Sequence, residues 1–115
     1  MLPKVNPTTT KAWNLLQQHY SEIKSVQLRE LFRNDLKRFT NFSIRHDDIL
    51  FDYSKNIISE RTIKLLLQLA EECKVKEAIN SMFSGDIING TEKRSVLHTA
   101  LRNSPASLFL QKVTM

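Results

Sequence analysis

Apolar side chains recur every three or four positions along much of the chain, which is the spacing of one buried helix face. Residues 10–23 show this pattern first, and residues 26–39 show it again. A threonine at position 8, 9 or 10 and Ser25 are the expected N-terminal caps. We expect the two helices to pair through their apolar faces, with the basic residues of the second helix on its solvated side. The apolar positions are Trp13, Leu16, Tyr20 and Ile23, then Leu28, Leu31, Phe32, Leu36 and Phe39; the basic residues are Arg29, Arg33, Lys37 and Arg38.

Helical periodicity stops at residues 41–43, and the segment that follows predicts a β ribbon. Residues 49–53 are short, apolar and aromatic, which is typical of a strand. Ile44 begins the partner strand, and His46, Asp47 and Asp48 form the turn. Because a ribbon of two strands is only marginally stable alone, it has to pack on helices or on a surface outside this sequence.

Three more helices are predicted after the ribbon. Ser59 caps a helix over residues 60–73, since Glu60 follows in the first turn, where a carboxylate is favourable. A short helix over 75–83 ends at Gly85. Asn89 and Glu92 have the spacing of a capping box and open a last helix that ends at residues 103–105. The expected apolar positions are Ile63, Leu65, Leu66, Leu67, Leu69, Ala70 and Cys73, then Val75, Ile79, Met82 and Phe83, then Val96, Leu97, Ala100 and Leu101.

The length and composition agree with this mainly α fold with one short β ribbon. A chain of 115 residues makes one domain at most. Its 2 glycines argue against a turn-rich β fold and against a glycine-rich phosphate loop. Cys73 is the only cysteine, which excludes an internal disulfide and is typical of a reducing compartment. The longest apolar run is three leucines, so we expect no membrane span and a cytoplasmic protein.

The net charge of +5 lies in the first part of the chain, where residues 1–46 hold 8 Lys and Arg against 3 Asp and Glu. A basic surplus can indicate an anionic partner such as nucleic acid. Here the charges are spaced singly, which favours a solvated surface. The junction between the first two helices lacks the glycine usual in a helix-turn-helix. We expect no specific nucleic-acid binding, and keep a small basic helical module for nucleic-acid or protein interaction as the alternative function.

The residues offer little catalytic or metal-binding chemistry on local spacing alone. The histidines are His19, His46 and His98, and no two of them are three or four positions apart. His46 with Asp47 and Asp48 would need another ligand to hold a metal, and a solvated turn is the favoured interpretation. We therefore assign no catalytic, substrate-binding or metal-binding residue, and no cofactor.

Three strings of the sequence, in order and in register, point to a family. They are Ile49–Asn56 with its Asp-Tyr-Ser-Lys-Asn, Met82–Asn89 with its Met-Phe-x-Gly-x-x-Ile-Asn, and Asn89–Asn103 with its Thr-Glu-x-Arg-x-Val-Leu-His-x-Ala-Leu-Arg. Upstream, Leu31-Phe32, Arg38-Phe39 and Phe42-Ser43 agree with it as well. The sequence resembles the N-terminal segment of glucose-6-phosphate isomerase over residues 1–103, and residues 104–115 form a divergent tail.

This resemblance implies an enzyme family that interconverts glucose 6-phosphate and fructose 6-phosphate in glycolysis and gluconeogenesis. It implies α/β/α sandwich domains of the SIS type, here incomplete, and a homodimer that binds a sugar phosphate. The family's sugar-phosphate loop, glutamate base and ring-opening residues have no counterpart in these 115 residues. We therefore expect an inactive fragment of the enzyme that is marginally stable or self-associates.

Arg94 and His98 are the two residues for which the resemblance suggests a role. They lie four apart on the expected last helix and would share one face. One interpretation places them in a supporting shell around the active site of the intact enzyme. The other is that they tie this helix to a neighbouring strand by hydrogen bonds.

Overall fold

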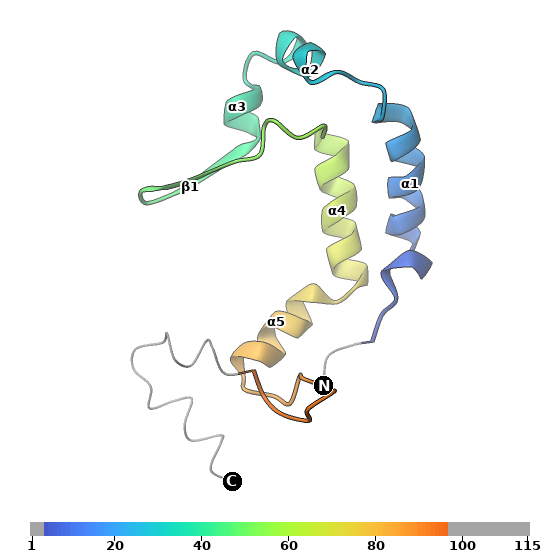
Figure 1. The fold of residues 1–115 in the computed structure, drawn as a ribbon, viewed down its shortest axis with the longest axis vertical. Coiled ribbons are helices and arrows are strands. Elements are labelled where there is room, and N and C mark those ends of the chain that lie inside the picture. The colour runs from blue at the N-terminus through green and yellow to red at the C-terminus, as the bar shows by residue number, and fades with distance from the viewer. Residues whose placement is uncertain (1–3, 97–115) are drawn as a thin grey trace. The chain divides into compact units, whose positions relative to one another are not determined.

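The computed structural model describes residues 4–96 of the chain. This part is mainly helical with one two-stranded antiparallel ribbon, as the sequence predicted (Figure 1). Within the described residues, 11–68 form one unit, and 4–10 with 69–96 belong to another. After a 3-10 turn at Pro7–Thr9, the elements are α1 (Lys11–Ile23), α2 (Leu28–Asn34), α3 (Arg38–Asn41), β1 (Ser43–His46), β2 (Ile49–Asp52), α4 (Glu60–Glu72) and α5 (Val75–Phe83).

Helix α1 confirms the first predicted helix, but its buried face differs from the expected one. Ala12 and His19 are buried at 0% and 4% exposure, whereas Tyr20 is 64% exposed. Positions 12 and 19 lie on one side of a helix because they are two turns apart. The sequence pattern counted His19 as polar and therefore centred the face one position too late. The buried side chain of His19 reaches Thr62 of α4, and α4 lies beside α1 (Figure 1). We had expected α1 to pair with the second helix of the chain.

The single helix predicted over residues 26–39 is wrong, because the chain breaks it into α2 and α3. The carboxylate of Asp35 accepts a hydrogen bond from the backbone N–H of Lys37 at 2.9 Å. Such an Asx turn offers the backbone an alternative to the helix. Ser25 is not the cap of α2 either, since Gln27 occupies that position and its side chain makes no capping hydrogen bond.

The break in this helix reverses two predicted environments. Leu36, expected in the apolar face, is 94% exposed. Arg38, expected on the solvated side, is only 3% exposed. After the break a new helix, α3, begins at Arg38. The Arg38 side chain therefore does not lie on the solvated side that a continuous helix would give it.

The ribbon is confirmed, but its turn consists of Asp47 and Asp48, because His46 is the last residue of β1 and pairs with Ile49. Asp47 has a φ of 51°, a left-handed conformation that Asp tolerates in tight turns. Ser43 pairs with Asp52 and Ile44 with Phe51. The ribbon extends away from α3 and α4 (Figure 1), and every residue of β2 is exposed.

Helix α4 begins where predicted, and Ser59 is its cap. The Ser59 hydroxyl accepts from the Thr62 backbone N–H at 3.3 Å. The buried residues of α4 are Thr62 and Leu65. Leu66 and Leu67, which the pattern placed in the core, are exposed. As in α1, a buried polar residue shifted the face from its expected position.

Helix α5 ends at Gly85 as the sequence predicted. Gly85 has a φ of 75°, and its N–H donates to the carbonyl of Met82 at 3.3 Å. The next N–H, of Asp86, donates to the carbonyl of Ser81 at 3.0 Å. This pair of bonds is the Schellman motif, in which a left-handed residue satisfies the last carbonyls of the helix.

The last predicted helix is not formed in its described part. Asn89 pairs with Arg94 in an isolated antiparallel bridge, so residues 89–94 close a turn. The Asn89 side chain does accept from the N–H groups of Thr91 and Glu92, at 3.2 and 3.1 Å. Its own backbone N–H, however, donates to the carbonyl of Arg94 at 3.1 Å and not to Glu92, which a capping box requires. Positions 97–101 of the predicted helix lie outside the described residues.

Candidate functional site

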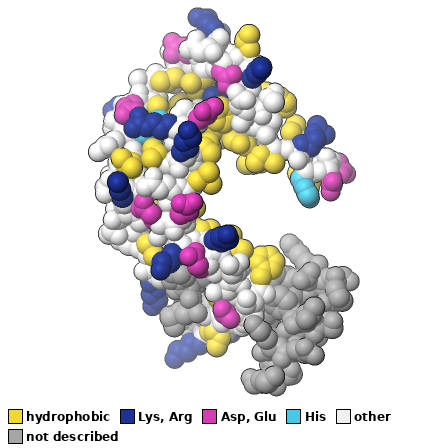
Figure 2. Space-filling model, turned by 180° about the vertical axis from the view of Figure 1, so that it is seen from behind, with side chains coloured by type: hydrophobic (Ala, Val, Ile, Leu, Met, Phe, Trp, Pro, Cys, Tyr) yellow, Lys and Arg dark blue, Asp and Glu magenta, His cyan; other side chains and the backbone are white. Residues whose placement is uncertain are grey.

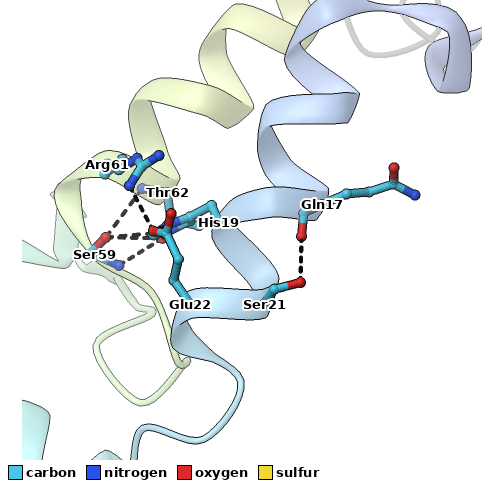
Figure 3. A network of polar contacts seen from close by, with 7 residues as sticks. All are labelled: Gln17, His19, Ser21, Glu22, Ser59, Arg61 and Thr62. Carbon is cyan, nitrogen blue, oxygen red and sulfur yellow. Dashed lines mark hydrogen bonds and ion pairs between the residues drawn. The ribbon is translucent and has the colours of Figure 1, made fainter.

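A cluster of polar side chains joins α1 to the start of α4 (Figure 3). His19 points from α1 toward Thr62, and its Nε2 lies 2.7 Å from the Thr62 Oγ1. On the other side of the ring, Nδ1 lies 3.4 Å from a carboxylate oxygen of Glu22. Arg61 donates to the same carboxylate oxygen at 2.7 Å. We call His19, Glu22, Ser59, Arg61 and Thr62 the histidine cluster.

The donors and acceptors of the histidine cluster satisfy one another. The backbone N–H of Ser59 donates to the Thr62 hydroxyl at 2.9 Å, and this closes a reciprocal cap with the bond from the Thr62 N–H to Ser59. An ionised carboxylate only accepts, so in the neutral imidazole Nδ1 carries the hydrogen toward Glu22. Nε2 then accepts from the Thr62 hydroxyl, whose hydrogen is still free to donate. The cluster thus fixes the tautomer of His19.

A hydroxyl, an imidazole and a carboxylate in series resemble the parts of a nucleophilic site. Here they serve to hold two helices together. The Thr62 hydroxyl is buried and already accepts from Ser59, and both ring nitrogens of the buried His19 have partners. Glu22 is in turn shared with Arg61. General base catalysis needs a base that can reach a substrate, which this arrangement does not offer.

A second polar cluster is centred on the buried guanidinium of Arg38. Its Nε donates to the carbonyl of Ser54 at 2.8 Å, and one terminal nitrogen donates to the carbonyls of Asn56 and Ile58 at 2.7 and 3.1 Å. The guanidinium carbon also lies 4.7 Å from the ring centre of Phe42, within the range of a cation–π contact. The three carbonyls replace water around the buried charge. Arg38 therefore fastens the loop that leads from the ribbon into α4.

The same loop is held from the ribbon by Asp52. The Asp52 carboxylate accepts from the backbone N–H of Ser54 at 2.9 Å. Hydrogen bonds from the Ser54 side chain and backbone hold the pKa of Asp52 below its ordinary value, and the charge of Lys55 lowers this pKa further. The hydrogen bonds from Ser54 lower this pKa more than the charge of Lys55 does. Tyr53 packs its ring edge-on against Phe42, with the ring centres 6.0 Å apart.

A cavity of about 210 Å³ lies beside both clusters. It is below the range of roughly 300–1,000 Å³ typical of small-molecule sites. Its charged lining residues are Arg38, Asp35 and Glu60. The two carboxylates oppose a phosphate group at this position, so the cavity does not suit a sugar phosphate.

Arg94, one of the two residues singled out by the sequence, lies in the turn that replaces the predicted helix. Its guanidinium pairs with the carboxylate of Glu92. A cavity of about 670 Å³ adjoins this turn and is lined by Asp86, Ile87, Gly90 and Lys93. His98 lies outside the described residues, so the shared face of Arg94 and His98 stays a prediction.

The turn at His46 is as exposed as the sequence suggested. The His46 and Asp47 side chains are 87% and 83% exposed, and they lie 3.8 Å apart. The described residues contain no group of three or more His, Cys, Asp or Glu side chains arranged to hold a metal ion. Within the same range no helix is long and apolar enough to cross a membrane.

Comparison with known proteins identifies the family of this chain. A family model described as phosphoglucose isomerase matches residues 52–112, which begin at the Asp52 that holds the loop. The chain belongs to the phosphoglucose isomerase family. The expected resemblance to glucose-6-phosphate isomerase is confirmed.

Three relatives in the phosphoglucose isomerase family are named glucose-6-phosphate isomerase. Those of Christiangramia forsetii and Wigglesworthia glossinidia brevipalpis are each 57% identical, over 88% and 89% of this chain. That of Baumannia cicadellinicola is 54% identical over 89% of the chain. In each case the chain spans 19% of the length of the relative, about a fifth.

The structure shows what the residues of one family-like sequence string, Asp52–Asn56, do in the fold. In Asp52–Asn56, the carboxylate of Asp52 binds the N–H of Ser54, while Ser54 and Asn56 offer their carbonyls to Arg38. Ser54 is 1% exposed, so a small residue is needed where the loop crosses the buried guanidinium. In the described residues this string builds the loop that Arg38 binds.

Sequence reasoning missed the residues on which both clusters depend. His19 was judged only as a metal ligand, and Arg38 was assigned to the solvent. His19 contacts Ser59 and Thr62, 40 and 43 positions away, and the carbonyls bound by Arg38 lie 16 to 20 positions away. The one available signal was that Arg38 is followed by Phe42, an aromatic residue one turn away that can stack on a guanidinium.

Proposed function

We propose that this chain is an N-terminal part of a glucose-6-phosphate isomerase, the enzyme that interconverts glucose 6-phosphate and fructose 6-phosphate. The observation that carries the proposal is the 54–57% identity to three enzymes of that name over most of this chain. The intact enzyme would bind a sugar phosphate, act as a homodimer of α/β/α sandwich subunits and work in the cytoplasm. These properties come from the family.

Within that enzyme the 115 residues support the fold, and they do not transfer the proton. Aldose–ketose isomerisation needs an acid–base group of tuned pKa in a site that excludes water. His19 and Glu22 are bound into the joint between α1 and α4, and His46 with Asp47 lies open to solvent. We therefore expect the chain alone to be inactive.

Arg94 and His98 remain a proposal as a supporting shell of the intact site. Support for Arg94 is limited to its place in a closed turn, where Glu92 holds the guanidinium. No observation favours the alternative of a basic nucleic-acid module. The basic surplus that suggested it includes Arg38, which is buried and bound to carbonyls.

A segment exchange tests the proposed function. The part of the Christiangramia forsetii enzyme that aligns with this chain is replaced by the 115-residue sequence, and isomerase activity is measured in a host strain without its own enzyme. We expect turnover comparable to that of the parent enzyme, and none from the isolated chain. An exchanged enzyme that folds but has no turnover contradicts the proposal, and so does turnover by the purified chain alone.

A further inference from the structure

The turn over residues 89–94 contains the one asparagine of the sequence that is followed by glycine. In such a pair the backbone nitrogen of the glycine can attack the side-chain amide of the asparagine, because the glycine has no Cβ to hinder the approach. Asparagine is accordingly among the thermolabile residue types. In this chain the reacting pair is Asn89 and Gly90, and the turn holds both groups in a defined arrangement.

The side chain of Asn89 is folded back over its own peptide bond to Gly90. Its carbonyl oxygen, Oδ1, accepts from the backbone N–H groups of Thr91 and Glu92 at 3.2 and 3.1 Å. The bond to Thr91 closes an Asx turn. All atoms of the ring that forms in the reaction, from Cγ of Asn89 to the nitrogen of Gly90, belong to this turn. Ring closure therefore costs less conformational freedom here than in an unfolded chain.

The same two N–H groups stabilise the charge that develops during the attack. When the Gly90 nitrogen bonds to Cγ, Oδ1 of Asn89 takes up negative charge, and donors already aimed at that oxygen favour it. Among the described residues the N–H of Gly90 forms no hydrogen bond, whereas those of its neighbours in the turn do. Gly90, Thr91 and Glu92 are exposed, and charged side chains lie at the surface of this end of the described chain (Figure 2). Water therefore reaches the reacting groups.

We propose that Asn89 is a site of spontaneous deamidation and that the folded turn promotes the reaction. The Gly90 nitrogen bonds to Cγ of Asn89, the bond from Cγ to Nδ2 breaks, and the proton of the Gly90 amide leaves with Nδ2 as ammonia. Water then opens the succinimide ring. Addition at Cγ gives aspartate, and addition at the main-chain carbonyl gives isoaspartate, in which the backbone runs through the side chain. A molecule of water is consumed and a molecule of ammonia released, with no oxidation or reduction.

Either product disturbs the turn that formed it. Nδ2 of Asn89 donates to the carboxylate of Glu92 at 3.0 Å, and this bond is lost when Nδ2 leaves. The new carboxylate then faces that of Glu92, which is unfavourable. In isoaspartate the longer backbone also displaces the N–H of residue 89, which now donates to the carbonyl of Arg94 at 3.1 Å. We therefore expect the turn to open after the reaction.

The test incubates the purified chain at mildly alkaline pH and follows Asn89 by peptide mapping with mass spectrometry and by enzymatic labelling of isoaspartate. A synthetic peptide of residues 86–96 gives the rate without the fold. We expect Asn89 in the chain to react about tenfold faster than in the peptide. Asn80 is the internal control and should stay intact, because α5 keeps the N–H that follows it in helical hydrogen bonds.

The matched variant is Gly90→Ala, which hinders the attacking nitrogen. A Cβ at this position meets no atom within 4 Å, so circular dichroism of the variant should equal that of the parent chain. We expect its reaction to be slower by about tenfold or more. The same substitution in the peptide should slow the reaction there too, which separates hindrance from any change in the fold.

The opposite results overturn the proposal. If Asn89 in the chain reacts no faster than in the peptide, the turn does not promote deamidation. If Gly90→Ala reacts as fast as the parent chain, the Gly90 nitrogen is not the attacking group. Conversion of Asn80 at the same rate as Asn89 would mean that the turn has no special reactivity. None of these measurements depends on isomerase activity, so they leave the proposed function untouched.

Discussion

The Nε2 of His19 and the Oγ1 of Thr62 lie 2.7 Å apart, although 43 positions separate the two residues in the sequence. This hydrogen bond joins the buried side of α1 to the first turn of α4. It uses the hydroxyl that also completes the cap with Ser59. One buried threonine therefore both ends the loop after the ribbon and fixes the helix that packs beside it.

Replacing His19 by alanine is expected to lower the free energy of unfolding by about 2 kcal/mol, since Thr62 loses a buried partner and a cavity is left. The measurement is urea unfolding followed by circular dichroism. Tyr20→Ala, at the next and exposed position of α1, is the control and should change stability by less than about 1 kcal/mol. Equal losses for the two variants would show that the bond to Thr62 does not stabilise the chain.

Replacing Arg38 by lysine is expected to destabilise the chain by about 2 kcal/mol, although the charge is kept. A single ammonium cannot reproduce the fork that serves the carbonyls of Ser54, Asn56 and Ile58. The matched control is Arg33→Lys on the exposed surface of α2, where we expect a change within about 0.5 kcal/mol. The measurement is the urea midpoint of each variant. If Arg38→Lys is as stable as Arg33→Lys, the hydrogen bonds from Arg38 to the three carbonyls do not stabilise the chain.

The existence of the helices and the ribbon followed from local pattern, whereas their buried faces did not. Spacing predicted α1, α4 and α5 nearly to the residue, because periodicity is a local property. The faces of α1 and α4 were misplaced because His19 and Thr62 are polar yet buried. The hydrogen bond between them spans 43 positions and helps to make their burial favourable, and a pattern of apolar positions contains no trace of it.

The break between α2 and α3 illustrates the same limit at shorter range. The carboxylate of Asp35 competes with the helix by binding the N–H of Lys37. That possibility was visible in the sequence, but the apolar spacing through Leu36 argued for a continuous helix. Once the helix breaks, Arg38 can turn inward to the loop, so the residue that organises this candidate site could not be assigned from the spacing.

The carboxyl group of Asp52 should make stability depend on pH at the acidic end. Its pKa in the folded chain is lowered by Ser54, so its contribution is present above the unfolded pKa and is lost as the pH falls through the folded value. We expect the stability advantage of the parent chain over Asp52→Asn to be constant above about pH 5 and to shrink as the pH falls below the ordinary aspartate pKa of about 3.9. Thermal midpoints across this range test it. A difference that does not change with pH would assign the effect to the shape of the side chain.

The two glycines form a natural matched pair for a test of backbone conformation. Gly85→Ala places a side chain at a φ of 75° in the Schellman motif and is expected to cost about 1 kcal/mol or more. Gly90→Ala should be nearly neutral, since a Cβ there meets no atom within 4 Å. The comparison uses thermal unfolding of both variants. If Gly90→Ala is the more destabilising of the two, the end of α5 is not set by the conformation of Gly85.

The isolated chain is expected to be marginally stable or to self-associate. In the described residues only Ala12, Phe42 and Leu65 are buried apolar side chains, whereas fourteen large ones are at least 42% exposed. So small a core offsets little of the conformational entropy lost on folding. Sedimentation combined with thermal melting over a concentration series should show either a loose monomer that binds a hydrophobic dye or an oligomer whose melting temperature rises with concentration. A compact monomer with a sharp transition that is independent of concentration would contradict this expectation. Such a result would mean that the exposed residues of the ribbon and of α4 need no partner surface.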